Sequence, residues 1–233
     1  MRARDIERAV LFDPLGLPLA VPAQGFSAVH DGAEPFLRLA RQRIMAANRR
    51  RPRGAREAEG REAAPTAVVA DSQSVKTTEA GGPRGFDAAK KIKGRKRHVA
   101  VDTLGLPIEC QITPADMQDR DALAPLLRET RRKSPFVTMC FVDSGYNGDE
   151  AQRAAFEASR ISITVVPRND KQIKGFIVLP KRWVVERTFG WINRARRLAK
   201  DFEATIESAL AWLLIALAFL LTRRLARLSG SAT

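Results

Sequence analysis

The sequence predicts an α/β domain in which a mixed sheet is flanked by helices, preceded by a basic N-terminal arm. Strand-like and helix-like segments alternate from Pro65 onward in the order β-β-β-α-β-α-β-α-α, which is typical of a sheet covered by helices. Hydrophobic residues make up 45% of the 233 residues, enough to bury a core. We therefore expect the arm at residues 1–62 and the folded domain at residues 63–230.

Short apolar runs bounded by turn residues are predicted to form the strands. The first run ends at Asp71, and a later one ends at a second acid, Asp143. Between them, two strands are joined at the turn Leu104-Gly105. The runs occupy residues 66–72, 97–114 (two strands), 136–146 and 161–168.

Amphipathic or continuous apolar patterns predict the helices. Pro180 stands at the first turn of the third helix, where its missing N–H is tolerated. The last helix is almost wholly apolar, but its thirteen residues fall short of the roughly 20 needed to cross a bilayer. We read it as a buried helix closed by Arg223 and Arg224 and expect no membrane partner, with a membrane anchor as the alternative. The helices are expected at residues 119–133, 149–160, 180–202 and 209–221.

The charge of the chain predicts a polyanionic partner. The formal net charge is +14 and the isoelectric point is about 10.8. Residues 41–62 are dense in arginine and are read as a solvated helix or disordered arm touching phosphates, or as a plain linker. Cys110 and Cys140 lie in apolar runs, as buried thiols of a reducing, cytoplasmic compartment do. Two histidines are too few for a histidine-rich metal site.

Three acids are the candidate catalytic residues. Asp71 and Asp143 each end a strand, and strand ends of an open α/β sheet are where sites form. Glu186 lies beside the apolar stripe of the third helix. Each acid has a simpler explanation, because a lone aspartate is usually a cap or turn residue and Glu186 could pair with Arg182.

Three carboxylates without thiolate or imidazole partners make a site of hard oxygen ligands. Such ligands suit Mg²⁺ or Mn²⁺. Two such ions can activate the attacking oxygen and stabilise the leaving oxygen of a phosphodiester. We therefore expect Asp71, Asp143 and Glu186 to bind two divalent ions, with neighbouring lysines and arginines holding the DNA.

Three blocks of sequence resemble the catalytic blocks of bacterial DDE transposases of the insertion-sequence-five family. They are "DSQSVKTTEAGGPRGFDAAKKIKGRKRH", "FVDSGYNG" and "LPKRWVVERTFGWINRARRLAKDFE", and the resemblance covers about residues 62–228. It implies a ribonuclease-H-like fold and metal-dependent cleavage and joining of DNA, with the acids in the order Asp71, Asp143, Glu186. Leu179 and Asn193 stand where related transposases have a tyrosine and a lysine.

Two basic groups are expected to hold the phosphates. One surrounds a glycine-rich stretch whose backbone can approach the DNA, and the other lies around Glu186. The DNA-binding candidates are Lys76, Arg84, Lys91, Lys93, Arg95, Lys96, Arg97, Arg182, Arg187, Arg194 and Arg197.

The expected partner is double-stranded DNA, both transposon inverted repeats and target, in the cytoplasm at the nucleoid. A homodimer on DNA and the product of an upstream reading frame are further expected partners. The alternative function is a catalytically silent DNA-binding remnant or transposition inhibitor.

Overall fold

The computed structural model describes residues 11–12, 18–19, 53–79, 82–166 and 182–230. The chain divides into two compact units, residues 1–36 and 37–233. In the first unit, strand β1 (Leu11–Phe12) pairs antiparallel with β2 (Pro18–Leu19). All further description concerns the second unit, which carries the predicted α/β domain.

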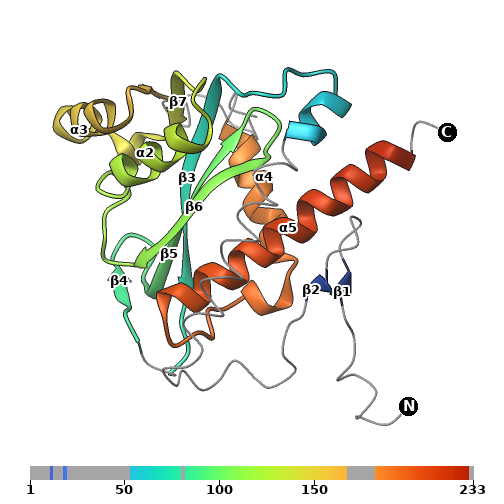
Figure 1. Cartoon of the computed structure of the whole chain (residues 1–233). Coiled ribbons are helices and arrows are strands. Elements are labelled where there is room, and N and C mark those ends of the chain that lie inside the picture. Colours follow the sequence, from blue (N-terminus) through green and yellow to red (C-terminus); the bar gives the residue numbers. More distant parts are fainter. Residues whose placement is uncertain (1–10, 13–17, 20–52, 80–81, 167–181, 231–233) are drawn as a thin grey trace, which may run out of the picture. The chain divides into compact units, whose positions relative to one another are not determined.

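A six-stranded mixed sheet forms the centre of this domain (Figure 1). β3 pairs in parallel with β7, and β7 in parallel with β8, whereas β5 runs antiparallel to β3, β4 and β6. The strands are β3 (Ala67–Lys76), β4 (Gly85–Asp87), β5 (Ile92–Asp102), β6 (Pro107–Pro114), β7 (Met139–Val142) and β8 (Ser162–Val165).

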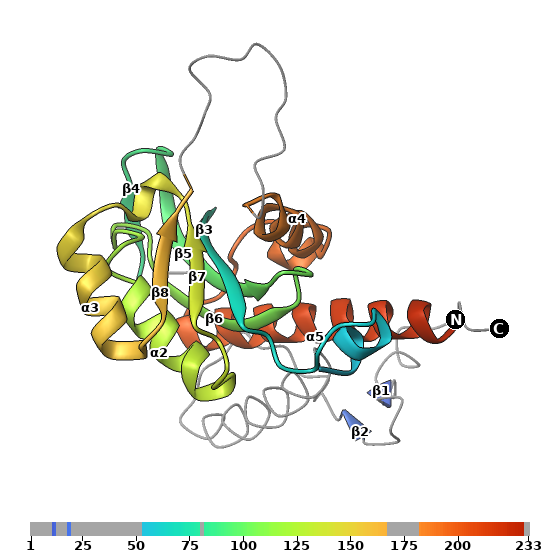
Figure 2. The ribbon, with the colours of Figure 1, turned by 90° about the horizontal axis from the view of Figure 1, so that it is seen from above.

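Helices cover both faces of the sheet, as the sequence predicts (Figure 2). α2 (Leu123–Lys133) and α3 (Asp149–Ser159) lie on one face. α4 (Arg182–Asn193) and α5 (Ile206–Gly230) lie on the other. Two short 3₁₀ helices, η2 (Ser144–Tyr146) and η3 (Arg196–Leu198), complete the described elements.

The alternation of side chains along β3 supplies both cores. Val69 packs in the cluster that includes α4 and α5, whereas Val68 and Ala70 pack in the cluster that includes α2 and α3. Successive side chains of a strand point to opposite faces, so a run apolar at every position is buried on both sides. The predicted mixed sheet with helices on its faces is therefore confirmed.

Several element boundaries differ from the expectation. β3 is ten residues long and continues past Asp71 to Lys76, because β5 pairs with it along that length. α4 ends at Asn193, earlier than expected. Pro180 lies outside the described residues. The acids before α2 do not cap it, since Ala122 is its N-cap and no side chain bonds there.

α5 is longer than predicted. It has 25 residues and continues through Arg223 and Arg224, which were expected to close it. The segment Ile206–Leu228 is long and apolar enough to cross a membrane by length and composition. One face of the helix is nevertheless part of the domain core, where Leu213 and Leu217 are buried against the sheet.

The end of the predicted arm packs on the domain. Residues 53–58 are helical, and Ala55 is fully buried in a small cluster with Leu106 and Leu221. Two ion pairs fasten this segment, one from Arg56 to Asp102 at 2.6 Å and one from Arg224 to Glu59 at 2.6 Å. We name residues 53–62 the latch.

Candidate active site at the ends of two parallel strands

Asp71 and Asp143 lie at the same end of the pairing between two neighbouring parallel strands. The register of β3 and β7 pairs Ala67 with Met139 and Val69 with Phe141. Asp71 lies two residues after Val69 within β3, and Asp143 directly follows the last residue of β7, so both acids lie beyond the same end of this pairing. Because Val69 and Phe141 both pack on the face of α4 and α5, the two acids belong to that face.

Local backbone groups orient both carboxylates. The N–H of Ser72 donates to Oδ1 of Asp71 at 2.7 Å. The N–H of Gly145 donates to Oδ1 of Asp143 at 2.8 Å, so Asp143 is the N-cap of η2. The capping role foreseen for a lone aspartate is thus present at Asp143, in addition to its place beside Asp71.

Tyr146 is a residue of this site that sequence reasoning missed. Its side chain is buried among apolar residues of β3 and β7, and its hydroxyl has no hydrogen-bond partner among the described residues. Burial first, and then the charges of Asp71, Asp119 and Asp143, raise the pKa of the phenol well above its usual value. The phenol is therefore neutral, and the charges of both acids act on it although its ring packs in the cluster of α2 and α3. The only available signal was its position three residues after Asp143.

Glu186 lies on α4, the helix that packs against β3 and β5 on the same face as the acid pair. Val185 and Phe189 of α4 are buried in the core, and Glu186 is exposed on the flank of this buried stripe. Within the described residues, no group of three or more His, Cys, Asp or Glu side chains lies close enough together to hold a metal ion. The structure thus places the first two acids at one end of the β3–β7 pairing and the third on the helix that packs against β3.

The composition of the acid pair fits a hard divalent cation. Its side-chain donors are carboxylate oxygens, which Mg²⁺ and Mn²⁺ prefer. Gln73, whose side chain shares the face of Asp71 on β3, also carries a buried side-chain oxygen without a described partner, Oε1. Unsatisfied buried oxygens beside a carboxylate pair are typical of a place that water or an ion completes.

Arg187 and Thr188 fasten α4 to the β5–β6 turn. Nη2 of Arg187 donates to the carbonyl of Leu104 at 2.8 Å, and Oγ1 of Thr188 donates to the carbonyl of Gly105 at 2.9 Å. A Cβ on Gly105, whose φ is +79°, would lie 3.1 Å from the Thr188 hydroxyl. This close approach therefore suits glycine, and it fixes the helix that carries Glu186.

Two tryptophans enclose the guanidinium of Arg187. Its central carbon lies 4.3 Å from the ring centre of Trp183 and 4.7 Å from that of Trp191. Such contacts stabilise a cation on an aromatic face. Burial, and then the neighbouring charge of Arg224, lower the pKa of Arg187. In this structure Arg187, expected to bind DNA, is engaged with protein groups.

The exposed members of the predicted DNA-binding set remain accessible. Lys76, Lys91, Lys93 and Arg194 are exposed, and the exposed Arg84 donates to the carbonyl of Thr78. Arg197 is 46% exposed and pairs with Glu203 at 2.6 Å. The side chain of Arg182, and with it the expected pair with Glu186, lies outside the described residues.

Three cations expected on phosphate are instead structural. Arg95 is completely buried and donates to Asp201 at 3.1 Å and to four backbone carbonyls. Lys96 pairs with Asp119 at 3.1 Å, and Arg97 donates to the carbonyl of Leu198 at 2.9 Å. The expectation of DNA contact is therefore wrong for Arg95, Lys96 and Arg97, because β5 is covered on both faces and its cations bind protein oxygens.

Two other sequence expectations concern buried residues. His98 is buried and its Nε2 lies 2.9 Å from Oγ1 of Thr113, so its role in this structure is structural. Cys110 and Cys140 are buried thiols, as predicted, and burial raises the pKa of the Cys140 thiol to about 12.

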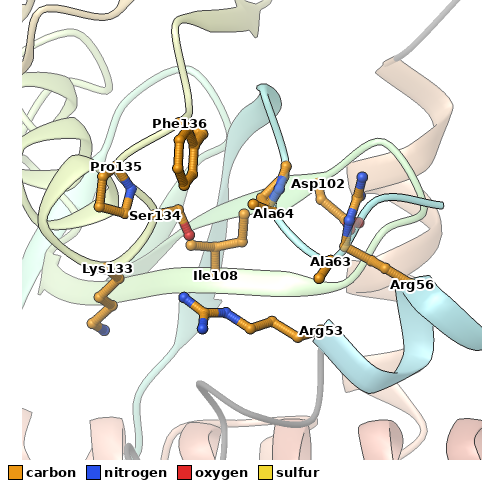
Figure 3. Close-up of a pocket in the computed structure, with 11 residues that line it drawn as sticks. Arg53, Arg56, Ala63, Ala64, Asp102, Ile108, Lys133, Ser134, Pro135 and Phe136 are labelled. Atoms are coloured by element: carbon orange, nitrogen blue, oxygen red, sulfur yellow. The ribbon is translucent and has the colours of Figure 1, made fainter.

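A shallow pocket lies near the opposite, amino-terminal end of β3 (Figure 3). Arg53, Arg56 and Lys133 bring positive charge to its wall. Two of these cations are paired, Arg56 with Asp102 and Lys133 with Glu109. The pocket is thus distinct from the acid pair, which lies beyond the other end of the β3–β7 pairing.

Comparison with known proteins gives a family match over most of the domain. The family described as "Transposase DDE domain" matches residues 62–221. A protein from Burkholderia cepacia named "Putative transposase for insertion sequence element IS402" is 33% identical over 132 residues. The aligned part covers 52% of this chain and 59% of that protein, so the chain spans little more than half the length of this curated relative.

Solved structures also resemble the chain at low sequence identity. The catalytic core domain of BIV integrase is 18% identical, with 65% of this chain and 82% of that chain covered and a TM-score of 0.41. The catalytic domain of Mos1 mariner transposase is 14% identical, with 79% of this chain and 92% of that chain covered and a TM-score of 0.39.

Proposed function

The chain belongs to the family of DDE-domain transposases, and from this premise we propose that it cleaves and joins DNA strands at the ends of an insertion sequence. Membership of the insertion-sequence-five family is the finer part of this proposal and rests on the three sequence blocks. The place of action is bacterial DNA, in the cytoplasm at the nucleoid.

The location of Asp71 and Asp143 at the same end of the β3–β7 pairing is the observation that supports the proposal. Two neighbouring carboxylates repel each other unless a cation or a proton lies between them. We assign Asp71, Asp143 and Glu186 as the residues that hold Mg²⁺ or Mn²⁺, two ions in all. When bound, such ions supply Lewis-acid activation of the attacking and leaving oxygens of a phosphodiester.

The protein's own residues position the parts of this site. Ser72 and Gly145 hold the two aspartates by their backbone N–H groups. Arg187 and Thr188 hold α4, so that Glu186 is presented on the face of the acid pair. Exposed cations at the end of β3 and in the β4–β5 hairpin neutralise the phosphates on either side of the cleaved bond.

Double-stranded DNA is the proposed substrate, both as inverted-repeat ends and as target. Transposition joins two ends, so we propose that two copies of the chain act together on DNA. The product of an upstream reading frame is a further proposed partner, because the curated relative extends beyond the aligned region.

The test is cleavage of the chain's own flanking DNA. The full chain, incubated with Mg²⁺ or Mn²⁺ and the inverted repeats that flank its coding sequence, is expected to nick at the repeat ends. Asp71→Asn, Asp143→Asn and Glu186→Gln are each expected to reduce nicking to background. Asp121→Asn is the matched control, because this side chain is 59% exposed and pairs only loosely with Arg120 at 3.9 Å.

Two results would contradict the proposal. Nicking by the three site variants at the parent rate would show that the acids are not the site. Salt-dependent binding of DNA by the parent, without cleavage in Mn²⁺, would instead support the silent DNA-binding alternative.

A further inference from the structure

The β4–β5 hairpin exposes a phenylalanine among cations. Phe86, in the middle of β4, is 55% exposed and pairs across the hairpin with Lys93 of β5. Cross-strand partners point to the same face, so Phe86 and Lys93 present an apolar ring and an ammonium group side by side. Covering an exposed aromatic side chain with a partner is favourable, because it removes apolar surface from water.

The hairpin is rigidly built and positively charged. The buried carboxylate of Asp87 accepts hydrogen bonds from Ser74 of β3 and from the backbone N–H groups of the turn. The exposed acid Asp116 lies against Gly85 at its root. The exposed cations of the hairpin are Arg84, Lys90, Lys91 and Lys93.

The turn has a lysine in a backbone conformation that glycine adopts at a lower free-energy cost. Lys91 has φ +53°, in the left-handed region that side chains with a Cβ rarely adopt. A strained, exposed lysine at the tip of a hairpin indicates that its charge is used.

Phe86 lies on the same face of the sheet as the acid pair. β5 pairs Val99 with Asp71 and Lys93 with Phe86. Val99 and Lys93 are six positions apart, an even number, so their side chains share a face. At about 3.4 Å per residue the separation is about 20 Å, which corresponds to about six base pairs of B-DNA.

We propose that Phe86 is an apolar wedge that enters the DNA about six base pairs from the cleaved bond, while Arg84, Lys91 and Lys93 hold the adjacent phosphates. This inference rests on the proposed function. Aromatic side chains that enter a base step unstack it and bend the duplex, and the wider contact with the protein offsets the cost of unstacking. The charge around Phe86 favours DNA over a second protein as the partner that covers the ring.

The experiment uses the full chain and duplexes of its own inverted-repeat end, with 2-aminopurine placed at one position at a time. Ca²⁺ replaces Mg²⁺ so that the DNA stays intact. The parent is expected to raise the fluorescence at about six base pairs from the cleaved bond, because unstacking relieves quenching. Phe86→Ala should remove this rise and weaken binding about tenfold.

Two further variants make the result specific. Phe86→Leu keeps an apolar wedge and should retain most of the rise in fluorescence. Phe136→Ala, which truncates a phenylalanine that is 66% exposed just before β7, should leave the rise and the affinity unchanged.

The inference and the proposed function fail in different ways. If Phe86→Ala keeps the parent's fluorescence and affinity while the parent cleaves DNA, only the wedge is wrong. If the parent shows the Phe86-dependent rise but never cleaves in Mn²⁺, the wedge stands and the proposed function is wrong. Absence of DNA binding by the parent would overturn the inference outright.

Discussion

At the scale of single residues, the site combines oriented carboxylates with a buried hydroxyl. Asp71 and Asp143 each accept a backbone N–H, which limits how their oxygens can turn. Tyr146 brings a donor to the same place, although no described group accepts its proton. A buried hydroxyl without a partner costs about 1–3 kcal/mol, so this hydroxyl does not stabilise the fold.

Tyr146→Phe should separate these two effects. Removing the hydroxyl is expected to leave the free energy of unfolding unchanged or raise it by about 1 kcal/mol, because an unsatisfied polar group is lost. DNA nicking is expected to fall, and the Mg²⁺ concentration for half-maximal rate to rise. Thermal unfolding and a metal titration of the nicking rate provide the measurements. A variant with the parent's rate at every Mg²⁺ concentration would exclude a role for the hydroxyl.

At the scale of elements, the cations of β5 fall into two groups: buried ones that bind protein groups, and exposed ones that are accessible to solvent. From Gly94 to Asp102 every position is buried, and there the cations bind carboxylates and carbonyls. Before Gly94 the strand belongs to the hairpin, and Lys93 is exposed. The same run of positive charge therefore stabilises the fold at one end and presents charge to solvent at the other.

Lys91→Gly, in the hairpin turn, should make the domain more stable and weaken its binding to DNA. Glycine adopts the left-handed conformation freely, so the free energy of unfolding is expected to rise by about 0.5–1 kcal/mol. DNA affinity is expected to fall, and the slope of log K against log salt to become smaller by about 1. Urea unfolding and salt-titrated anisotropy would measure the two effects. Lys133→Gly is not a suitable control, because Lys133 is ion-paired. Lys90→Ala is the control: it removes one charge at an exposed position next to Lys91 and does not alter the left-handed backbone of Lys91.

At the scale of the whole domain, stability depends on a buried histidine. Burial lowers the pKa of His98 to about 4, from 6.5 in an unfolded chain, although the charge of Asp119 opposes the shift. As the pH falls below 6.5 the unfolded chain binds the proton first, so the folded state loses stability until the pH reaches about 4. The loss amounts to at most about 3 kcal/mol.

His98→Gln should flatten this pH dependence. The variant is expected to be less stable than the parent at pH 7.5, because it changes the contact with Thr113, but to lose less stability on acidification. Urea unfolding of both proteins at several pH values between 4 and 7.5 measures the difference. Equal losses in the two proteins would show that other groups carry the acid sensitivity of the domain.

The sequence predicts the structure of this domain well where a local pattern of residues is enough to determine the local conformation. The apolar runs before Asp71 and Asp143 form parts of the neighbouring strands β3 and β7, and the predicted turn at Gly105 is present with φ +79°. The local pattern does not show which strands, distant in the sequence, pair with each other. Arg95 is buried because residues more than a hundred positions away, including Asp201, cover it, and a charge run by itself does not show this.

The placement of Glu186 and Tyr146 also depends on tertiary structure. Helical spacing shows that Glu186 flanks the stripe around Val185, but not how closely the helix brings it to the aspartates. Tyr146 lies close in sequence to Asp143, yet only the packing of its ring among residues of β3 and β7 turns its hydroxyl into part of the site.

The latch has a practical consequence for anyone who expresses this domain. The family match begins at residue 62, whereas Arg56 and Glu59 reach across to Asp102 and Arg224 from the preceding turn of helix. A gene fragment started at the match would leave Asp102 as a buried anion without its counter-charge, which is strongly destabilising. Cloning boundaries drawn from homology alone would therefore yield an insoluble or rapidly degraded product, and the reading frame should begin upstream of this short helix.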